Sequence, residues 1–290
     1  MLNDVVDGSG LIDFDGFADF LRGQGFSRVY CRQLLNYARK YYGLLFTGNL
    51  SVVASLPGRR HIMASLSQLS RFLGCYSRFR ALVYESGLKW NGRKSEDVFM
   101  SLYDNGETVK QADSFMNELR QKADWDVYFQ VAYIALLGVR PVEGCNSLKI
   151  ISEQGLDGYL NREKLVLEHF RFPKVFIRGG KKLFVSCITE NLVSLLECWK
   201  GKSVLPVETL WKVIERCYRL PAKLYILRRA WATRMRDAGL YPEWIDLCQG
   251  RLPASVFLRS YYRPDMETVF AKVRAVVVEE MEKRYLDGMR

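Results

Sequence analysis

Three arginines and two adjacent tyrosines are the residues of this sequence best suited to chemistry on a phosphodiester. Arg140 lies near the middle of the chain, Arg228 follows much later, and Arg251 precedes Tyr261 and Tyr262. An oxygen nucleophile that attacks phosphorus places extra negative charge on the non-bridging oxygens, and planar guanidinium groups stabilise that charge with paired hydrogen bonds. We therefore expect Arg140 and Arg228 to form an anion clamp, with Arg251 as a third cation.

A tyrosine hydroxyl is the candidate nucleophile. Attack on phosphorus by Tyr261 would form a covalent phosphotyrosine bond, which conserves the bond energy for religation to another strand. Because the phenol has a pKa of about 10, its proton must be removed, and Tyr225 or a water molecule is available for this step. Arg251 cannot act as the base, since arginine keeps its proton at neutral pH. Glu143 is expected to orient an arginine of the clamp.

The same residues fall in the order of three motifs of a known family. The motifs are Gly138-Val139-Arg140-Pro141-Val142-Glu143, then Tyr225-Ile226-Leu227-Arg228 with Trp231, Ala232 and Thr233, and then Gln249-Gly250-Arg251 followed by the tyrosine pair. In this order the chain resembles the tyrosine recombinases, or phage-integrase family, which includes the Xer recombinases. It is most similar to integrases of archaeal viruses and plasmids. The resemblance covers the last two thirds of the chain by motif and the first third by layout.

Two positions differ from the usual family pattern. Tyr225 stands where the family usually has histidine, and Arg251 where it has histidine or tryptophan; archaeal members often carry Lys, Arg or Tyr there. Tyr261 matches the first tyrosine of a His-Tyr-Tyr pattern in archaeal relatives. The resemblance therefore favours Tyr261 as the nucleophile, with Tyr262 as the alternative.

The resemblance also implies a general acid on a β-hairpin. The family uses a hairpin lysine to protonate the leaving 5′ oxygen, and Lys181 occupies that place here, with Lys182 as its rival. The alternative is that Arg178, Lys181 and Lys182 only grip DNA. No metal or other cofactor is implied.

A mostly helical chain with one hairpin must position these residues. In the second part of the chain, 3.6-residue periodicity predicts helices at residues 108–122, 125–137, 191–199, 207–218, 228–238, 242–249 and 265–286. Apolar alternation at residues 164–188, around a turn from Arg178 to Lys182, predicts the β-hairpin. The expected fold class is mainly α with a small β-hairpin or sheet (α+β), in a tyrosine-recombinase catalytic domain spanning residues 96–290.

The first part of the chain reads as a separate helical domain. Helical patterns at residues 14–21, 29–45, 62–72 and 76–84 predict a small core-binding domain over residues 1–95, and the polar segment at 87–96 reads as a linker. Its polar positions carry Arg32, Arg39, Arg71 and Arg78 among tyrosines. These arginines, with Arg178 and Lys182 of the hairpin, are expected to contact DNA phosphates. The alternative is an ordinary solvated surface.

Composition narrows the class of protein further. The net charge of +11 and the pI near 9.3 favour a polyanionic partner. The acidic N-terminus and the lack of a long apolar run predict a cytoplasmic protein, in the host cytoplasm if viral, with no membrane partner. Seven scattered cysteines and only two histidines predict reduced thiols and no metal site.

The C-terminal helix predicted at residues 265–286 carries one apolar face, formed by Val269, Phe270, Val273, Val276 and Val277. In the family this element packs into a neighbouring protomer, which predicts a homo-tetramer on DNA from a protein that is a monomer when free. Docking of the helix on its own domain is the alternative.

These expectations converge on one activity, the site-specific cleavage and rejoining of double-stranded DNA at an attachment site through a 3′-phosphotyrosine intermediate. Its purpose would be the integration or excision of a mobile element. A type IB topoisomerase is one alternative. A DNA-binding relative with little or no catalytic activity is the other, because the family histidines are missing.

Overall fold

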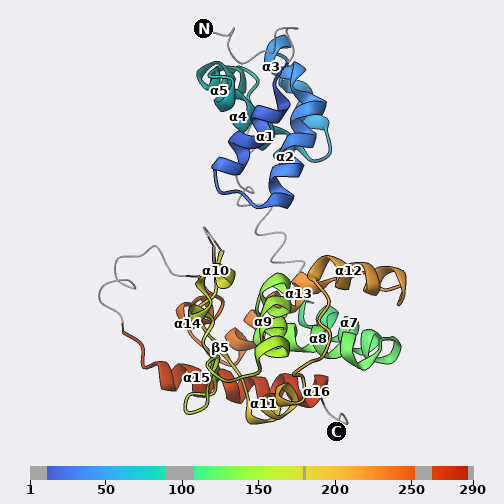
Figure 1. The fold of residues 1–290 in the computed structure, drawn as a ribbon, viewed down its shortest axis with the longest axis vertical. Helices are drawn as coiled ribbons and strands as arrows, with labels where there is room; N and C mark the ends of the chain where they lie inside the picture. The colour runs from blue at the N-terminus through green and yellow to red at the C-terminus, as the bar shows by residue number, and fades with distance from the viewer. Residues whose placement is uncertain (1–11, 89–107, 179–180, 252–262, 287–290) are drawn as a thin grey trace. The chain divides into compact units, whose positions relative to one another are not determined.

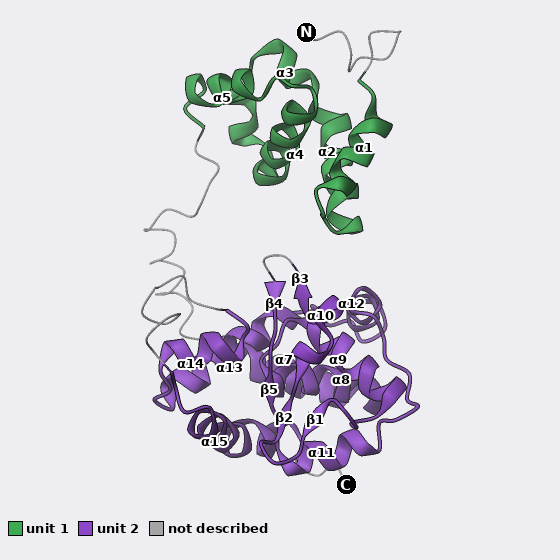
Figure 2. Ribbon diagram, turned by 60° about the vertical axis from the view of Figure 1, so that its left-hand side comes forward, with its two compact units in different colours: residues 1–99 green, residues 100–290 purple. Residues whose placement is uncertain are grey.

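The computed structural model describes residues 12–88, 108–178, 181–251 and 263–286. The chain divides into two compact units, Met1–Phe99 and Met100–Arg290, each with its own hydrophobic core (Figure 2). The sequence predicts the boundary near residue 95. Of the predicted linker at residues 87–96, only Gly87 and Leu88 lie within the described residues.

Unit 1 is built from short helices (Figure 1). They are α1 (Phe14–Gly23), α2 (Arg28–Tyr41), α3 (Gly43–Thr47), the 3-10 helix η1 (Ser51–Ser55), α4 (Arg59–Phe72) and α5 (Tyr76–Glu85). Asp13 and Ser27 begin the first two helices, because their side-chain oxygens accept hydrogen bonds from otherwise unpaired N–H groups of the first turn. Phe17, Leu34 and Leu66 are fully or almost fully buried where α1, α2 and α4 pack together.

Unit 2 surrounds one buried helix. Its helices are α7 (Thr108–Lys122), α8 (Trp125–Leu137), α9 (Pro141–Gln154), α11 (Glu190–Glu197), α12 (Val207–Arg216), α13 (Leu224–Asp237) and α14 (Pro242–Cys248). Every residue of α8 from Tyr128 to Leu137 is buried, as expected for a helix that is apolar on all sides. Helices α7, α9 and α13 pack against it. Within the described ranges, no helix has both the length and the apolar character needed to cross a bilayer.

Two small antiparallel sheets complete unit 2. Strand β2 (Val166–Leu167) pairs with β1 (Leu160–Asn161) on one side and β5 (Ser186–Cys187) on the other. A separate pair is formed by β3 (Ile177–Arg178) and β4 (Lys181–Lys182). The predicted fold class, mainly helical with a small antiparallel β component, is confirmed.

The hairpin is shorter than the sequence pattern predicts. The 3-10 helix η2 (His169–Arg171) and helix α10 (Pro173–Phe176) interrupt the alternating stretch at residues 164–188. Pro173 has no N–H to donate to a sheet and suits the first turn of a helix, so it starts α10 instead of continuing a strand. The prediction of one continuous hairpin over this stretch is wrong, and only β3 and β4 at its tip pair as predicted.

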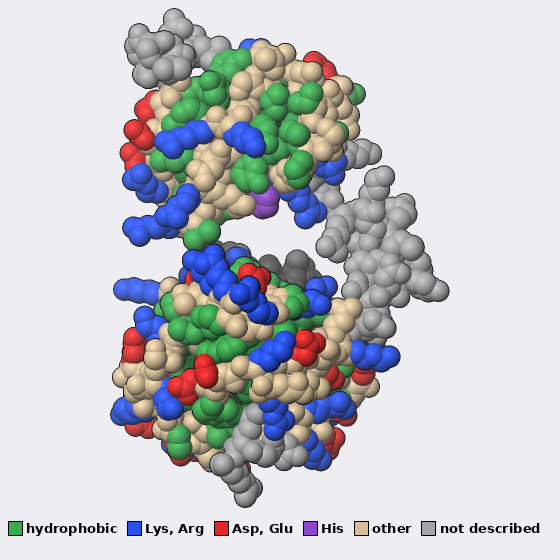
Figure 3. Space-filling model, turned by 90° about the vertical axis from the view of Figure 1, so that its right-hand side faces the viewer, with side chains coloured by type: hydrophobic (Ala, Val, Ile, Leu, Met, Phe, Trp, Pro, Cys, Tyr) green, Lys and Arg blue, Asp and Glu red, His purple; other side chains and the backbone are tan. Residues whose placement is uncertain are grey.

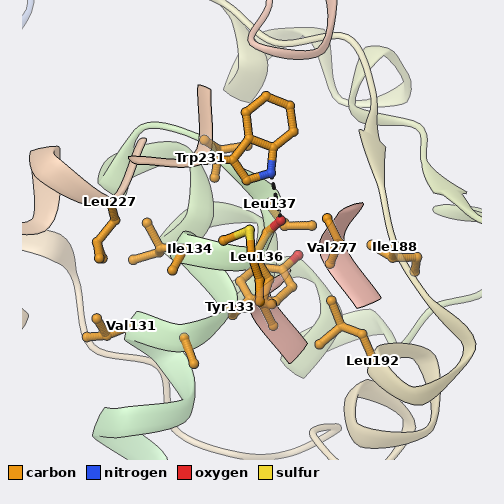
Figure 4. Packing of buried hydrophobic residues seen from close by; sticks show 14 of the residues in the cluster. Val131, Tyr133, Ile134, Leu136, Leu137, Ile188, Leu192, Leu227, Trp231 and Val277 are labelled. Atoms are coloured by element: carbon orange, nitrogen blue, oxygen red, sulfur yellow. Dashed lines mark hydrogen bonds between the residues drawn. The ribbon is translucent and has the colours of Figure 1, made fainter. Parts of the chain in front are cut away.

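The junction between α8 and α13 sets the position of the residues that follow α8. Trp231 of α13 is buried, and its Nε1 donates a hydrogen bond to the backbone oxygen of Leu136 at 3.1 Å (Figure 4). Gly138 ends α8 with a φ of 63°, and a Cβ at this residue would overlap the indole ring. Glycine is therefore required here for both its backbone conformation and its lack of a side chain.

The C-terminal segment packs on its own unit. It comprises α15 (Met266–Val276), the π-helical stretch η4 (Val277–Glu282) and α16 (Lys283–Tyr285). The whole predicted apolar face is buried in the core of unit 2, namely Val269, Phe270, Val273, Val276 and Val277. In the single chain this face therefore docks on its own domain, the alternative that the sequence leaves open, and its docking into a neighbouring protomer on DNA stays a prediction. The Tyr285 hydroxyl adds a polar anchor by donating to Asp113 Oδ1 at 2.7 Å.

Candidate active site

Arg140 is held at the N-terminus of α9 by the helix-capping interaction of Glu143. The backbone N–H of Arg140 donates to Glu143 Oε2 at 3.2 Å, and its Nη1 donates to Oε1 at 2.5 Å. The Glu143 side chain is 3% exposed, whereas that of Arg140 is 23% exposed. One buried carboxylate therefore caps the helix and directs the guanidinium, the orienting role that the sequence predicts for Glu143.

Arg228 approaches the same carboxylate from α13. Its Nη2 donates to the backbone oxygen of Gln249 at 2.7 Å, and its Nη1 to that of Gly138 at 3.4 Å. The same Nη1 lies 3.9 Å from Glu143 Oε2. The structure thus brings together the two arginines that the sequence assigns to the clamp, with Glu143 between them.

Burial and the neighbouring charges determine the pKa of Arg228. Burial lowers the pKa of Arg228 to about 10, the positive charge of Arg140 acts in the same direction, and Glu143 opposes both. Arg251 also lowers this pKa. Because the pKa stays well above 7, the guanidinium remains charged at neutral pH. Two guanidinium groups against one buried carboxylate leave an excess of positive charge that favours an anion.

Arg251 lies at the end of the turn that follows α14. Its Nη1 is 3.1 Å from Asp246 Oδ1, and more than half of its side chain is exposed. The preceding Gln249 is buried and donates from Nε2 to the backbone oxygens of Arg228, at 3.1 Å, and Gly138, at 3.4 Å. Backbone and side chain of Gln249 thus connect this turn to the arginine clamp.

The lysine hairpin is attached to the clamp through its backbone. The Lys182 carbonyl accepts a hydrogen bond from Arg140 Nη1 at 3.4 Å. It also lies against Gly250, where any Cβ would overlap it. Lys181 is exposed and opposite Arg178 in the β3–β4 pair, whereas Lys182 is partly buried. Since neighbouring residues of a strand point to opposite faces, only one of the two lysines can share the clamp's side of the hairpin.

Tyr225 lies at the start of α13, three residues before Arg228, and is 52% exposed. Its ring packs edge-on against Trp211 of α12, with ring centroids 5.7 Å apart. The role of Tyr225 as proton acceptor stays a prediction. The candidate nucleophiles, Tyr261 and Tyr262, lie outside the described residues.

The predicted DNA-binding arginines of unit 1 are all exposed. Arg32 lies on α2, the Arg39 guanidinium is 5.6 Å from the ring centre of Phe14, and the Arg71 guanidinium is 3.8 Å from that of Tyr76. Arg78 Nη2 donates to the backbone oxygen of Phe46 at 3.4 Å. On the face drawn in Figure 3, unit 1 carries basic side chains next to exposed hydrophobic ones. Rings that hold arginines in place would reduce the entropy lost if these side chains bound an anion.

The site combines three arginines with the single buried carboxylate of Glu143, and this excess of positive charge suits an anion. Within the described ranges, no group of three or more His, Cys, Asp or Glu side chains is arranged to hold a metal ion. All seven cysteines are free thiols.

Several residues of the site are not predicted by the sequence. Gln249, the carbonyl of Gly138, and Asp246 act through hydrogen bonds that residue type alone does not reveal. Two glycines are the feature of the sequence that could have indicated these contacts. Gly138 and Gly250 both have positive φ, a conformation that favours glycine and that often marks a close approach of backbones.

Comparisons with known proteins give no independent assignment. No protein-family model matches this chain. A search of curated proteins likewise finds no significant match.

Proposed function

We propose that this chain is a tyrosine site-specific recombinase of the integrase kind, which cleaves and rejoins double-stranded DNA through a covalent 3′-phosphotyrosine intermediate. One observation carries the proposal: Arg140 and Arg228, far apart in sequence, converge on the buried carboxylate of Glu143. The hairpin that bears Lys181 and the turn that bears Arg251 contact the same cluster. This is the set of cations that a phosphoryl-transfer site requires.

The reaction assigns a role to each group. The hydroxyl oxygen of Tyr261, or of Tyr262, attacks phosphorus, and the bond from phosphorus to the 5′ oxygen breaks. Arg140 and Arg228 stabilise the charge that develops on the non-bridging oxygens, supported by Arg251. Lys181 donates a proton to the leaving 5′ oxygen. The products are a 3′-phosphotyrosine and a free 5′ hydroxyl, and the reverse attack by another 5′ hydroxyl rejoins the DNA.

The proton of the nucleophile is released to water, either directly or through the Tyr225 hydroxyl, which gives up its own proton as it accepts another. The positive cluster favours the phenolate form of a nearby tyrosine, since opposite charges stabilise each other. Arg228, even with its pKa lowered to about 10, is a cation at neutral pH and accepts no proton. The reaction requires no metal ion or other cofactor.

Partner and assembly follow the same proposal. Double-stranded DNA with a specific attachment site is the substrate, and a homo-tetramer exchanges strands on it in pairs. The exposed arginines of unit 1, together with Arg178 and Lys182, contact the phosphate backbone. The biological outcome is the integration or excision of a mobile element, viral or plasmid-borne and archaeal by the resemblance. Since the apolar face of α15 is buried within its own unit, a tetramer needs either other contacts or the release of this helix from its own core.

A covalent adduct tests the proposal. The full chain is incubated with a pool of duplexes that contain randomised sequences and staggered nicks, so that a cleaved strand loses a short fragment and cannot be resealed. A band that survives denaturing electrophoresis and disappears after nuclease digestion is expected. It should be lost in Tyr261→Phe or in Tyr262→Phe, and an adduct that persists in the double variant contradicts the assignment.

A second candidate is a DNA-binding relative without cleavage activity. It is favoured by the packing of Tyr225 against Trp211 and by the pairing of Arg251 with Asp246, which engage two of the predicted catalytic side chains elsewhere. Tight binding to selected duplexes with no adduct on nicked DNA would support it. Relaxation of supercoiled DNA at low protein concentration would instead indicate a type IB topoisomerase.

A further inference from the structure

A chain of buried hydrogen bonds crosses unit 2 beside the candidate site. Tyr133 of α8 contacts Ser147 of α9 at 2.6 Å, and Ser147 contacts Tyr159 at 2.8 Å. The Tyr159 hydroxyl lies 2.6 Å from His169 Nδ1, and His169 Nε2 lies 2.7 Å from Ser186 Oγ of β5. All five side chains are buried. The chain thus connects two helices to the segments that precede and follow the lysine hairpin.

The protonation state of His169 makes this chain directional. Burial lowers the pKa of His169 to about 3, so the imidazole is neutral at neutral pH. A neutral imidazole donates from one nitrogen and accepts at the other. Each hydroxyl between its neighbours must then donate in the same direction along the chain. Loss of the Tyr159 hydroxyl would remove two bonds. His169 Nδ1 would then have no partner in the core, and Ser147 would keep only Tyr133, which is costly.

The His169 ring also contacts the base of the lysine hairpin. Its centroid lies 4.6 Å from that of Phe176, the last residue of α10, and the Tyr159 ring stacks on Phe176 from 6.3 Å. The Phe176 carbonyl accepts a hydrogen bond from the N–H of Leu183 at 3.0 Å. Strands β3 and β4, with Lys181 and Lys182, lie between these two residues. His169 and Tyr159 therefore support the point at which the hairpin opens.

The same chain reaches the arginine clamp through α9. Ser147 lies about two helical turns beyond Arg140, which begins this helix. At the other end, Arg140 Nη1 donates to the Lys182 carbonyl. Helix α9, the hydrogen-bonded chain and the hairpin thus form a closed circuit. A shift at Tyr159 or His169 would change the distance between the hairpin lysine and the arginines.

We infer that Tyr159 and His169 are positioning residues, which hold the lysine hairpin in register with the arginine clamp. Neither side chain contacts substrate, because both are buried. The inference rests on the proposed function, since it assigns them an effect on proton donation to the leaving 5′ oxygen. If these residues had a purely structural role, their substitution would lower stability without specifically slowing protonation of the leaving 5′ oxygen.

The test compares two substrates and two matched variants. Tyr159→Phe and Tyr285→Phe each remove one buried hydroxyl with two hydrogen-bonding neighbours, and only Tyr159 belongs to the chain. The substrates are a nicked duplex and the same duplex with sulfur in place of the bridging 5′ oxygen. A thiolate leaves readily without a proton, so the sulfur substrate does not need the hairpin lysine.

Tyr159→Phe should cleave the oxygen substrate about 10- to 100-fold more slowly, because small displacements of a reacting group are costly, and should cleave the sulfur substrate at close to the normal rate. Tyr285→Phe should show no such difference between the two substrates. Equal slowing of both substrates by Tyr159→Phe, or no slowing, overturns the inference. Ser147→Ala repeats the measurement with a smaller side chain should Tyr159→Phe fold poorly.

A second measurement separates this inference from the proposed function. Amide hydrogen exchange at Leu183, whose N–H donates to Phe176, should accelerate about tenfold in Tyr159→Phe and not in Tyr285→Phe. If the unaltered protein forms no adduct although Leu183 responds as expected, the proposed function fails and the hairpin support stands as a structural feature. If the adduct forms and Leu183 does not respond, the positioning role is rejected.

Discussion

The backbone of Gly250 lies directly against the carbonyl of Lys182. The contact joins the turn before Arg251 to strand β4, and no side chain of any size fits at this glycine. This contact restricts how far the lysine hairpin can move relative to Arg251. The geometry of the candidate site thus depends on a contact between two backbones.

Substitution of Gly250 should therefore damage both stability and activity. In Gly250→Ala, strain at a φ of 71° adds to overlap with the Lys182 backbone, and we expect the free energy of unfolding to fall by about 3 kcal/mol. Gly239→Ala is the matched control, because Gly239 has a φ of 85° with open space around it. It should lose about 1–2 kcal/mol from strain alone. Urea titration followed by tryptophan fluorescence measures both, and equal losses would show that the contact is unimportant.

Arg228→Lys should separate charge from geometry in the clamp. A lysine keeps the positive charge but cannot bond to Gln249 and to an incoming phosphate oxygen in the fixed fork of a guanidinium. If the proposed function holds, adduct formation should slow about 100-fold or more, with DNA affinity nearly unchanged. The exposed neighbour supplies the control, since Arg229→Lys should leave the cleavage rate unaltered. A cleavage rate in Arg228→Lys close to that of the unaltered chain would exclude Arg228 from the clamp.

Glu143→Gln should destabilise unit 2. The change leaves two guanidinium groups without their buried counter-charge, and breaking a buried ion pair costs about 3–5 kcal/mol. Since Arg140 is partly exposed, water offsets part of this loss, and we expect about 2–3 kcal/mol. The control is Glu153→Gln, because the pair of Glu153 with Lys149 is exposed on both sides and should contribute less than about 0.5 kcal/mol. A loss in Glu143→Gln no larger than in this control would mean that the arginines do not depend on Glu143.

The helices of unit 2 are predicted well where apolar periodicity and capping agree. The observed bounds of α7 and α8 match the predicted ones, since the apolar positions of each repeat at helical spacing up to a clear stop. Helix α9 is absent from the predicted elements, although Pro141 suits the first turn of a helix, the position that it occupies. The alternation near Phe170 and Phe172 suggests strands, but η2 and α10 lie in this stretch. The prediction fails there because period-two patterning is weak evidence over short segments.

The sequence predicts which side chains form the candidate site, but not the backbone contacts that hold them in place. Arg140, Glu143 and Arg228 come together as the order of the motifs suggests. The contacts of Gln249 and Gly250 depend on backbone groups, which every residue possesses, so no spacing in the sequence reveals them. The sequence also does not determine where the C-terminal helix docks, since an apolar face can pack on its own domain or on a neighbouring protomer.

The buried imidazole of His169 should make folding sensitive to mild acid. Burial holds its pKa at about 3, below the value near 6.5 in an unfolded chain, so between these values only the unfolded state takes up the proton. Stability is therefore fully present above pH 6.5 and declines as the pH falls toward 3. Tyr159, bonded to the ring, stays neutral because burial raises its pKa well above the usual value.

Between pH 7 and pH 5 this histidine alone should reduce the free energy of unfolding by about 2 kcal/mol. The unaltered chain should lose that much more than His169→Gln over the same interval, as measured by urea titration at each pH. The other histidine of the chain is the control, because His61 is exposed in unit 1 and His61→Gln should keep the full pH dependence. Parallel pH profiles for the unaltered chain and His169→Gln would mean that the imidazole is protonated in the folded state. That result would also remove the directional order assigned to the hydrogen-bonded chain.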